Sequence, residues 1–350
     1  MSVDLMFQQA NAAHRAGAWA QAEAQYLELR QHHPLFANHN LGVVYVATGR
    51  FAEAEAAFRA ALAIDPDCAA PRHSLGALLL AEGRYSDGWP LHEARRELPQ
   101  LGIPRPSLPY PEWTGQDLAG KRLLVVYEQG LGDQIQLARL APILAARGAE
   151  VILTCSPPLA RLFRGLAAQV LPVTPGFVPP RADYWALIHS LPLRMGLTLE
   201  SLPNQPYLAG AAAISTGGGV GVVARGAPSH VNDRFRSLQG DDAAALLAPG
   251  RDLAPEATGA DDFQDTAEIV GGLDLVIAVD TSVAHLAGAM GKPVWILLSA
   301  VETDWRWLRN RTDSPWHPSA RLYRQASAGV WAPVLAQVRR DLAALGLDRR

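Results

Sequence analysis

The chain has 350 residues, of which 49% are hydrophobic and 19% charged, and its formal net charge is −3. This composition is typical of a globular chain of two or three domains and excludes a disordered one. The small net charge gives no general electrostatic attraction to nucleic acid or to an anionic membrane. Cys68 and Cys155 are too few for a disulfide framework or a closed cysteine zinc site. The first residues show no basic stretch followed by an apolar core, so we expect a cytoplasmic setting. The cations are almost all arginine, with Lys121 and Lys292 the only lysines.

The first part of the chain carries a repeated helical pattern. Its glycines, Gly17, Gly49 and Gly83, lie 32 and then 34 residues apart. Each is followed by an aromatic residue, then a small one, then a second ring: Trp19, Ala22 and Tyr26; Phe51, Ala54 and Phe58; Tyr85, Gly88 and His92. A glycine ends one helix, the small residue allows close approach, and the ring fills the gap between helix pairs.

This spacing resembles that of the tetratricopeptide repeat and predicts about three repeats over residues 5–97, within a repeat domain 1–97. Such repeats form a short superhelix whose concave face suits a protein segment. Bracing of the next domain is the alternative role.

A proline-rich segment over residues 98–116 predicts an extended linker. Apolar runs at 122–127, 151–154, 170–173 and 184–188 then predict buried parallel strands, with a helix over 134–147 that Pro142 can kink. A second series follows a flexible stretch at 217–219, with strands at 220–224, 273–279 and 293–298 and helices at 282–290 and 331–345. The alternation predicts an α plus α/β chain: Rossmann-type halves at 117–210 and 211–325 around a cleft, then a C-terminal helix within 326–350.

A glycine-containing turn follows the first predicted strand. Gly130 and Gly132 would let a phosphate group approach the backbone at the start of a helix. Ile135 stands where a dinucleotide fingerprint needs its third glycine, so NAD binding is not expected. Asp133 either caps this helix or acts as a general base.

A second motif follows the strand at 273–279. The residues around the start of the next helix are Asp280, Thr281, Ser282, Val283 and His285. Free backbone N–H groups and two hydroxyls predict a diphosphate site here. His285, taken alone, is more typical of a packed structural residue than of a catalyst.

Two further motifs lie in loops. Arg234 and Arg236 offer forked donors to phosphate oxygens, or else belong to an exposed loop in which an arginine pairs with Asp233. Trp305 and Trp307 follow the strand at 293–298 and either stack on a base or sugar or cover the end of the sheet.

Together these motifs resemble bacterial tetratricopeptide-repeat proteins with a C-terminal glycosyltransferase-B domain, a pair of Rossmann-type halves related to the heptosyltransferase group (family nine). The domain order is like that of O-GlcNAc transferases. The matching segments are 113–115, 128–136, 232–237, 265–267, 273–288, 304–308 and 314–316.

The resemblance implies that Asp133 is the base for the acceptor hydroxyl and that Arg236, with Arg234 second, neutralises the leaving phosphate. It implies donor-diphosphate binding by Asp280, Thr281, Ser282, Val283 and His285. The resemblance also implies that no metal is needed. The nucleotide-sugar is a co-substrate, so no separate cofactor is implied. The interval 238–264 is shorter than in the family and predicts a second half that lacks a sheet element.

The expected function is therefore transfer of a sugar from a nucleotide-sugar to a protein acceptor held by the repeats. The resemblance makes flagellin or another bacterial surface protein the expected acceptor. The alternatives are a non-catalytic scaffold with a degenerate transferase-like domain, and heptosyltransferase-like transfer to a lipid-linked saccharide.

Overall fold

The computed structural model describes residues 3–208, 218–230 and 232–347. The chain divides into two compact units, Met1–Arg105 and Pro106–Arg350. The division falls inside the proline-rich segment, where a short 3-10 turn, η2 (Pro99–Leu101), follows the first unit's last helices. Farther along this segment, the backbone N–H of Trp113 donates to the carbonyl of Trp185 at 2.7 Å, which joins the segment to the second unit.

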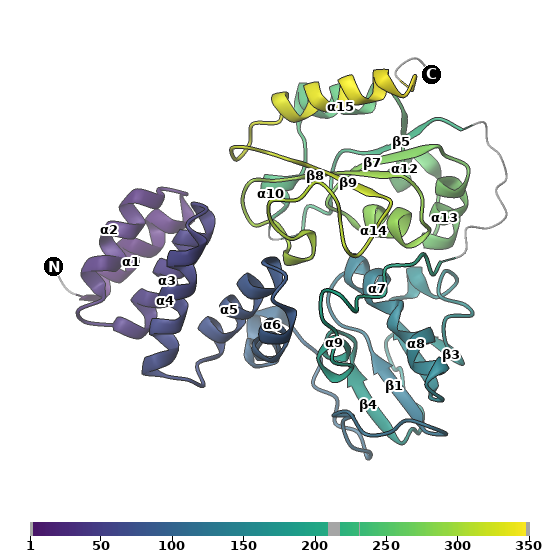
Figure 1. The fold of residues 1–350 in the computed structure, drawn as a ribbon, viewed down its shortest axis with the longest axis horizontal. Helices are drawn as coiled ribbons and strands as arrows, with labels where there is room; N and C mark the ends of the chain where they lie inside the picture. The colour runs from purple at the N-terminus through teal and green to yellow at the C-terminus, as the bar shows by residue number, and fades with distance from the viewer. Residues whose placement is uncertain (1–2, 209–217, 231, 348–350) are drawn as a thin grey trace. The chain divides into compact units, whose positions relative to one another are not determined.

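The first unit is built from helix pairs (Figure 1). They are α1 (Val3–Arg15) with α2 (Trp19–Leu29), α3 (Pro34–Ala47) with α4 (Phe51–Ile64), and α5 (Ala69–Ala81) with α6 (Tyr85–His92), followed by the 3-10 turn η1 (Glu93–Glu97). The predicted helical repeats are therefore confirmed.

The repeat glycines form the turns that their spacing predicts, and the ring of Phe58 packs against a further glycine, Gly42. Gly17, Gly49 and Gly83 have φ values of 72°, 76° and 78°, in the left-handed region that favours glycine where each first helix turns into its partner. A Cβ atom on Gly42 would lie 2.4 Å from the ring of Phe58, which is 1% exposed. The Phe58 ring thus occupies the space that a side chain at Gly42 would need, which lets α3 and α4 approach closely.

The second unit begins with a parallel sheet whose strand order is β3-β2-β1-β4. Its strands are β1 (Arg122–Val126), β2 (Glu150–Cys155), β3 (Gln169–Pro172) and β4 (Tyr184–Leu187), with the 3-10 turns η3 (Pro157–Leu159) and η4 (Ile188–Ser190) and the helix α9 (Leu191–Arg194). The single helix predicted over 134–147 is instead two helices, α7 (Leu131–Ala138) and α8 (Leu140–Ala146). Pro142 lies in the first turn of α8 and has no N–H to donate to the carbonyl of Ala138, so the helix divides at Arg139, one turn before the proline.

A second parallel sheet follows, with strand order β6-β5-β7-β8-β9. Its strands are β5 (Val220–Val223), β6 (Arg251–Asp252), β7 (Leu275–Val279), β8 (Val294–Leu298) and β9 (Ala320–Arg324). The helical elements are α10 (Asp233–Arg236), α11 (Gly240–Leu247), α12 (Pro255–Thr258), α13 (Phe263–Gly271), α14 (Ser282–Ala289), the 3-10 turn η5 (Trp305–Trp307) and α15 (Ala332–Ala344). Two parallel α/β halves after a helical repeat unit confirm the predicted fold class.

Two sequence-based expectations about this half need correction. The interval 238–264 was expected to lack a sheet element, but it holds α11, the edge strand β6 and α12. The strand escapes a search for apolar runs because it is two residues long and consists of Arg251 and Asp252. Strand β9 was not predicted. Of the flexible stretch expected at 217–219, residue 217 lies outside the described residues, and Gly218 and Gly219 lead into β5.

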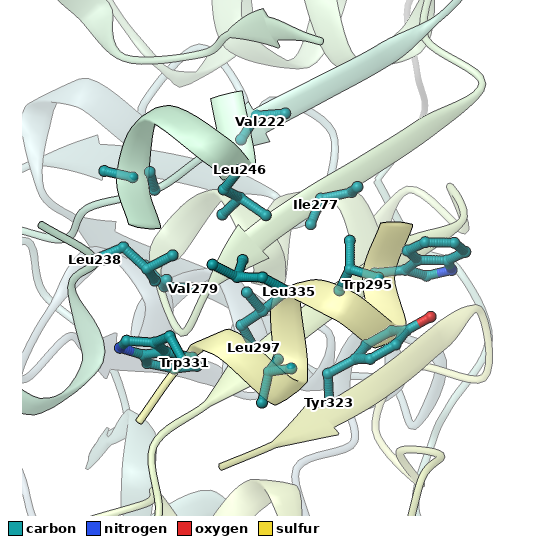
Figure 2. Packing of buried hydrophobic residues seen from close by; sticks show 14 of the residues in the cluster. Val222, Leu238, Leu246, Ile277, Val279, Trp295, Leu297, Tyr323, Trp331 and Leu335 are labelled. Atoms are coloured by element: carbon teal, nitrogen blue, oxygen red, sulfur yellow. The ribbon is translucent and has the colours of Figure 1, made fainter. Parts of the chain in front are cut away.

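The core of the second half lies between its sheet and the helices α11 and α15 (Figure 2). Strand residues such as Ile277 and Leu297 are fully buried there, and Leu335 of α15 is 3% exposed. Burying this apolar face of α15 contributes about 25 cal/mol per Å² removed from water. The predicted C-terminal helix is thus a structural layer of this half.

Candidate functional site

The carboxyl ends of strands from both sheets meet at one place in the second unit. Glu128 and Asp133 follow β1, His189 follows β4, and Arg306 follows β8. We call these four residues the strand-end cluster. Because ligands of open parallel sheets bind beyond the carboxyl ends of the strands, this is the position at which a site is expected.

Asp133 is held by groups from both halves. Its Oδ2 atom accepts the backbone N–H of Gly130 at 2.9 Å, which is the capping role that the sequence left open. Its Oδ1 atom accepts a hydrogen bond from Nη2 of Arg306 and lies 3.4 Å from Nε2 of His189. Burial alone would raise the pKa of Asp133, but Arg306 and His189 outweigh it and hold this pKa below its usual range. The carboxylate is therefore ionised at neutral pH.

Arg306 is the cation at the centre of the cluster. Arg306 is 4% exposed, and its Nη1 atom donates to Oδ2 of Asp304 at 2.6 Å. The backbone N–H of Arg306 also donates to Oδ1 of Asp304, at 2.9 Å. Burial would lower the pKa of Arg306, but Asp304 and Asp133 raise it above its ordinary value. Sequence analysis quoted this loop for its tryptophans and missed the arginine between them.

His189 is backed by a buried carboxylate. Oε1 of Glu128 accepts the backbone N–H of His189 at 2.9 Å and lies 3.5 Å from its Nδ1 atom. Burial would lower the pKa of His189, but Glu128 and Asp133 outweigh it and raise this pKa. Nη2 of Arg306, which can only donate, also lies 2.9 Å from Nε2 of His189, so this ring nitrogen accepts from it while His189 is neutral. When His189 is protonated, both groups face Oδ1 of Asp133, and each cation can neutralise this carboxylate.

Helices α7 and α14, one from each half, lie against each other (Figure 1). A Cβ atom on Gly132 would lie 2.9 Å from Cδ2 of His285, so glycine is required there for the helices to approach. His285 stacks on Trp307 with ring centroids 5.0 Å apart, and its Nδ1 atom lies 3.3 Å from Nε2 of His317. Burial lowers the pKa of His285 to about 3, with a contribution from Arg306. This histidine is a neutral packing residue in the structure, the alternative that the sequence favoured for a lone histidine.

The remaining donor-site residues lie around the carboxyl end of β7. Nη1 of Arg236 donates to the backbone carbonyl of Asp280 at 2.7 Å, and its guanidinium covers Gly226, where a Cβ atom would lie 2.5 Å from Nη2. Burial and the Asp304 carboxylate raise the pKa of Asp280 to about 6. Thr281 is the N-cap of α14, and its buried Oγ1 atom has no hydrogen-bond partner among the described residues. Arg236, Asp280 and Thr281 are thus brought together, with Ser282 and Val283 in the first turn of α14.

Two predicted site residues, Arg234 and Trp305, make their contacts with neighbouring aromatic rings. Arg234 is exposed, and its guanidinium lies 4.4 Å from the ring centre of its neighbour Phe235. Trp305 is 8% exposed and packs against Trp316, with ring centroids 6.1 Å apart, and against the Arg306 guanidinium. Trp305 is therefore packed inside this half, and its stacking on a base or sugar stays a prediction.

A second arginine joins the two halves away from the cluster. Nη1 of Arg139 donates to the carbonyls of Pro203 and Trp316, each at 2.7 Å, and Nη2 lies 3.3 Å from Nδ1 of His317. Arg139 is 2% exposed and occupies the break between α7 and α8. Sequence analysis missed it, because its partners lie as far as 178 residues along the chain.

Within residues 3–208, 218–230 and 232–347, no group of three or more His, Cys, Asp or Glu side chains is placed to hold a metal ion. In the same described part, no helix has the length and apolar character needed to cross a membrane.

Comparison with known proteins supports the repeat unit most directly. Residues 35–68 match the tetratricopeptide repeat family model, so this segment is a tetratricopeptide repeat. The chain is 30% identical over 379 residues to Protein FlbA of Caulobacter vibrioides, an alignment that covers 89% of this chain and 61% of FlbA. The chain thus spans about three fifths of the length of this relative. A mutant O-GlcNAc transferase of Thermobaculum terrenum aligns over 99% of this chain and 90% of its own at 15% identity, but the TM-score is 0.28, which is too low to carry an argument.

Proposed function

We propose that this chain is a metal-independent glycosyltransferase of the glycosyltransferase-B type that moves a sugar from a nucleotide-sugar to a protein acceptor. One observation carries the proposal: carboxyl ends of strands from two parallel sheets converge on Asp133 beside the first turn of α14. This arrangement offers a general base and an anion-binding helix start at one place. The relationship to heptosyltransferases is part of the proposal and rests on the sequence motifs.

The donor's diphosphate would bind at the start of α14. The backbone N–H groups of Thr281, Ser282 and Val283 and the unpartnered hydroxyl of Thr281 supply donors for its oxygens. Arg236, held against the Asp280 carbonyl, supplies positive charge at the same strand end. A fixed guanidinium stabilises the negative charge that develops on the leaving group, as a metal cation does in other transferases.

The transfer itself is a single displacement. The acceptor hydroxyl oxygen bonds to the anomeric carbon, its proton passes to the Asp133 carboxylate, and the bond between that carbon and the phosphate oxygen breaks. The electron pair of that bond leaves with the nucleoside diphosphate. Asp133 suits this role because it is ionised at neutral pH and its side chain is 20% exposed.

The acceptor that we propose is a protein segment bound by the tetratricopeptide repeats, whose known use is to bind such segments. A bacterial surface protein such as flagellin, modified in the cytoplasm, is the acceptor that the sequence resemblance favours. Transfer to a lipid-linked saccharide would instead leave the repeats a purely structural role.

The test is a thermal-shift and hydrolysis screen with UDP-, GDP-, ADP-, CMP- and dTDP-sugars. One nucleotide class should raise the unfolding temperature, and Arg236→Ala should abolish this rise. Arg251→Ala is the matched control, because Arg251 is an exposed arginine of the same half at the edge strand β6. Failure of every nucleotide to stabilise the protein would refute the proposal.

A non-catalytic scaffold is the second candidate, and one observation favours it. The carboxylate of Asp133 is committed to Arg306, which makes it a weak base as it stands. Nucleotide binding without transfer to any acceptor, and equal behaviour of wild type and Asp133→Asn, would select the scaffold.

A further inference from the structure

Arg306 is a buried cation shared by carboxylates from the two halves. Its Nη2 atom pairs with Asp133 of the first half, and its Nη1 atom pairs with Asp304 of the second half at 2.6 Å. The Arg306 side chain is only 5% exposed. The same guanidinium is attracted by Asp280, the residue before the N-cap of α14. It therefore lies between the proposed base and the proposed donor site.

The hydrogen-bonding capacity of this region is incompletely used. The Nε atom of Arg306 is buried and has no acceptor among the described residues. The Oγ1 atom of Thr281 is also buried and has no hydrogen-bond partner among them. A buried donor without an acceptor destabilises the folded state, because its hydrogen bond to water is lost and not replaced. Phosphate oxygens would accept from both groups, and a guanidinium binds phosphate in a forked geometry.

The loop that carries Arg306 has backbone strain on both sides of it. Glu302, Leu308 and Asn310 have φ values of 52°, 49° and 53°, in a region that side chains other than glycine rarely adopt. Residues in this conformation are strained, and they concentrate at ligand clamps and switches. The strain is consistent with a loop that has a second arrangement.

We propose that Arg306 exchanges partners when the donor binds: it breaks its ion pair with Asp133 and binds the oxygens of the donor's diphosphate instead. This inference rests on the proposed function and specifies how its two halves communicate. Without donor, the base is paired with Arg306. With donor, Arg306 neutralises the phosphate, and Asp133 is free to accept the proton of the acceptor hydroxyl. The acceptor thus meets a free carboxylate only when the sugar is in place.

The exchange leaves no buried charge without a partner. His189, backed by Glu128, stays beside Oδ1 of Asp133 at 3.4 Å when Arg306 moves. Asp304 keeps the Nη1 atom of Arg306 in both arrangements. This matters because an uncompensated buried charge is strongly destabilising and would block the exchange.

A double-mutant cycle with nucleoside diphosphates tests the exchange. The dissociation constants of UDP, GDP, ADP, CDP and dTDP are measured by calorimetry for wild type, Asp133→Asn, Arg306→Met and the double variant. Asp133→Asn should tighten binding of the recognised diphosphate by about 3- to 10-fold, because Asp133 no longer competes for the guanidinium. Arg306→Met should weaken binding by about 10-fold or more, and in its background Asp133→Asn should change affinity by less than about 2-fold.

The controls separate this exchange from folding and from charge at a distance. Arg311→Met is the matched control, because Arg311 pairs locally with Asp313 at 2.6 Å and should leave the affinity unchanged. If Arg306→Met does not fold by circular dichroism, Arg306→Lys replaces it in the cycle, with an intermediate loss of affinity expected. A gain from Asp133→Asn that persists without the arginine, or no gain at all, overturns the exchange. Absence of binding by wild type to every diphosphate refutes the proposed function itself, whereas binding without coupling refutes only the exchange.

Discussion

Acidification should destabilise the repeat unit through two partly buried histidines. His39 of α3 and His73 of α5 lie 34 residues apart, one repeat period. Burial lowers the pKa of His39 to about 4, with repulsion from His14 and His73, and burial with repulsion from Arg95 lowers the pKa of His73 to about 4. The unfolded chain takes up these protons at an ordinary pKa near 6.5. The unfolded state therefore binds more protons below that pH, and the free energy of unfolding falls as the pH drops from 6.5 toward 4.

The magnitude follows from the size of the two shifts. At about pH 5, a histidine whose pKa falls from 6.5 to about 4 loses about 2 kcal/mol of stabilisation, and below pH 4 about 3 kcal/mol. Because repulsion between the two histidines is part of the shift of His39, their sum is an upper bound of about 4 kcal/mol at pH 5, still a large share of the roughly 5–15 kcal/mol that stabilises a typical domain. Above pH 7 the contribution is fully present.

Amide hydrogen exchange of the full chain measures this locally. Protection of the α3 and α5 amides should fall steeply between pH 7 and pH 5 after correction for the intrinsic rate. His39→Gln and His73→Gln should each reduce the pH dependence, whereas His32→Gln, at an exposed site between α2 and α3, should not. An unchanged pH dependence in the double variant His39→Gln/His73→Gln would refute the reasoning.

Three further substitutions test the packing around the site. Gly132→Ala should lower the unfolding temperature of the second unit, because the added Cβ would lie 2.9 Å from Cδ2 of His285, and overpacking of this kind costs about 1–3 kcal/mol. Gln136→Met should raise the urea midpoint by an amount equivalent to about 1–2 kcal/mol, because the side chain is fully buried and neither of its polar atoms has a partner among the described residues. Arg139→Met should lower the unfolding temperature and increase proteolysis near residue 203, because it removes the donor to the carbonyls of Pro203 and Trp316 at a cost of about 2–4 kcal/mol. Unchanged thermal, urea or proteolysis profiles, respectively, would contradict these predictions.

The sequence predicts those parts of the fold that depend on neighbours along the chain. Repeat residues such as Gly42 and Phe58 contact each other across a single helix pair, so their spacing is visible in one dimension. Buried central strands such as β7 appear as continuous apolar runs. Strand β9 escapes this pattern because Arg321 and Arg324 interrupt its apolar residues at the edge of the sheet.

The candidate site was only partly predictable for the same physical reason. Asp133 could be found because a strand, a glycine turn and a helix start are adjacent in sequence. Arg306 pairs with it from 173 residues away, and His189 joins through β4 of the same sheet as β1. Such partners are determined by which strand ends become neighbours in the folded sheet, and a single sequence does not encode that order locally.

Two buried arginines that join the halves of the second unit, Arg139 and Arg306, differ in the kind of partner they bind. Arg139 donates to the neutral carbonyls of Gln136, Pro203 and Trp316, which no bound anion can displace without leaving a buried carbonyl without a donor. Arg306 binds carboxylates, and an incoming phosphate offers it the same charge and geometry. A lysine could serve neither role, because its point charge cannot bind several segments at fixed angles. It follows that Arg139 is a permanent tie and Arg306 an exchangeable one, so the halves can remain joined while the contact at Asp133 is broken and remade.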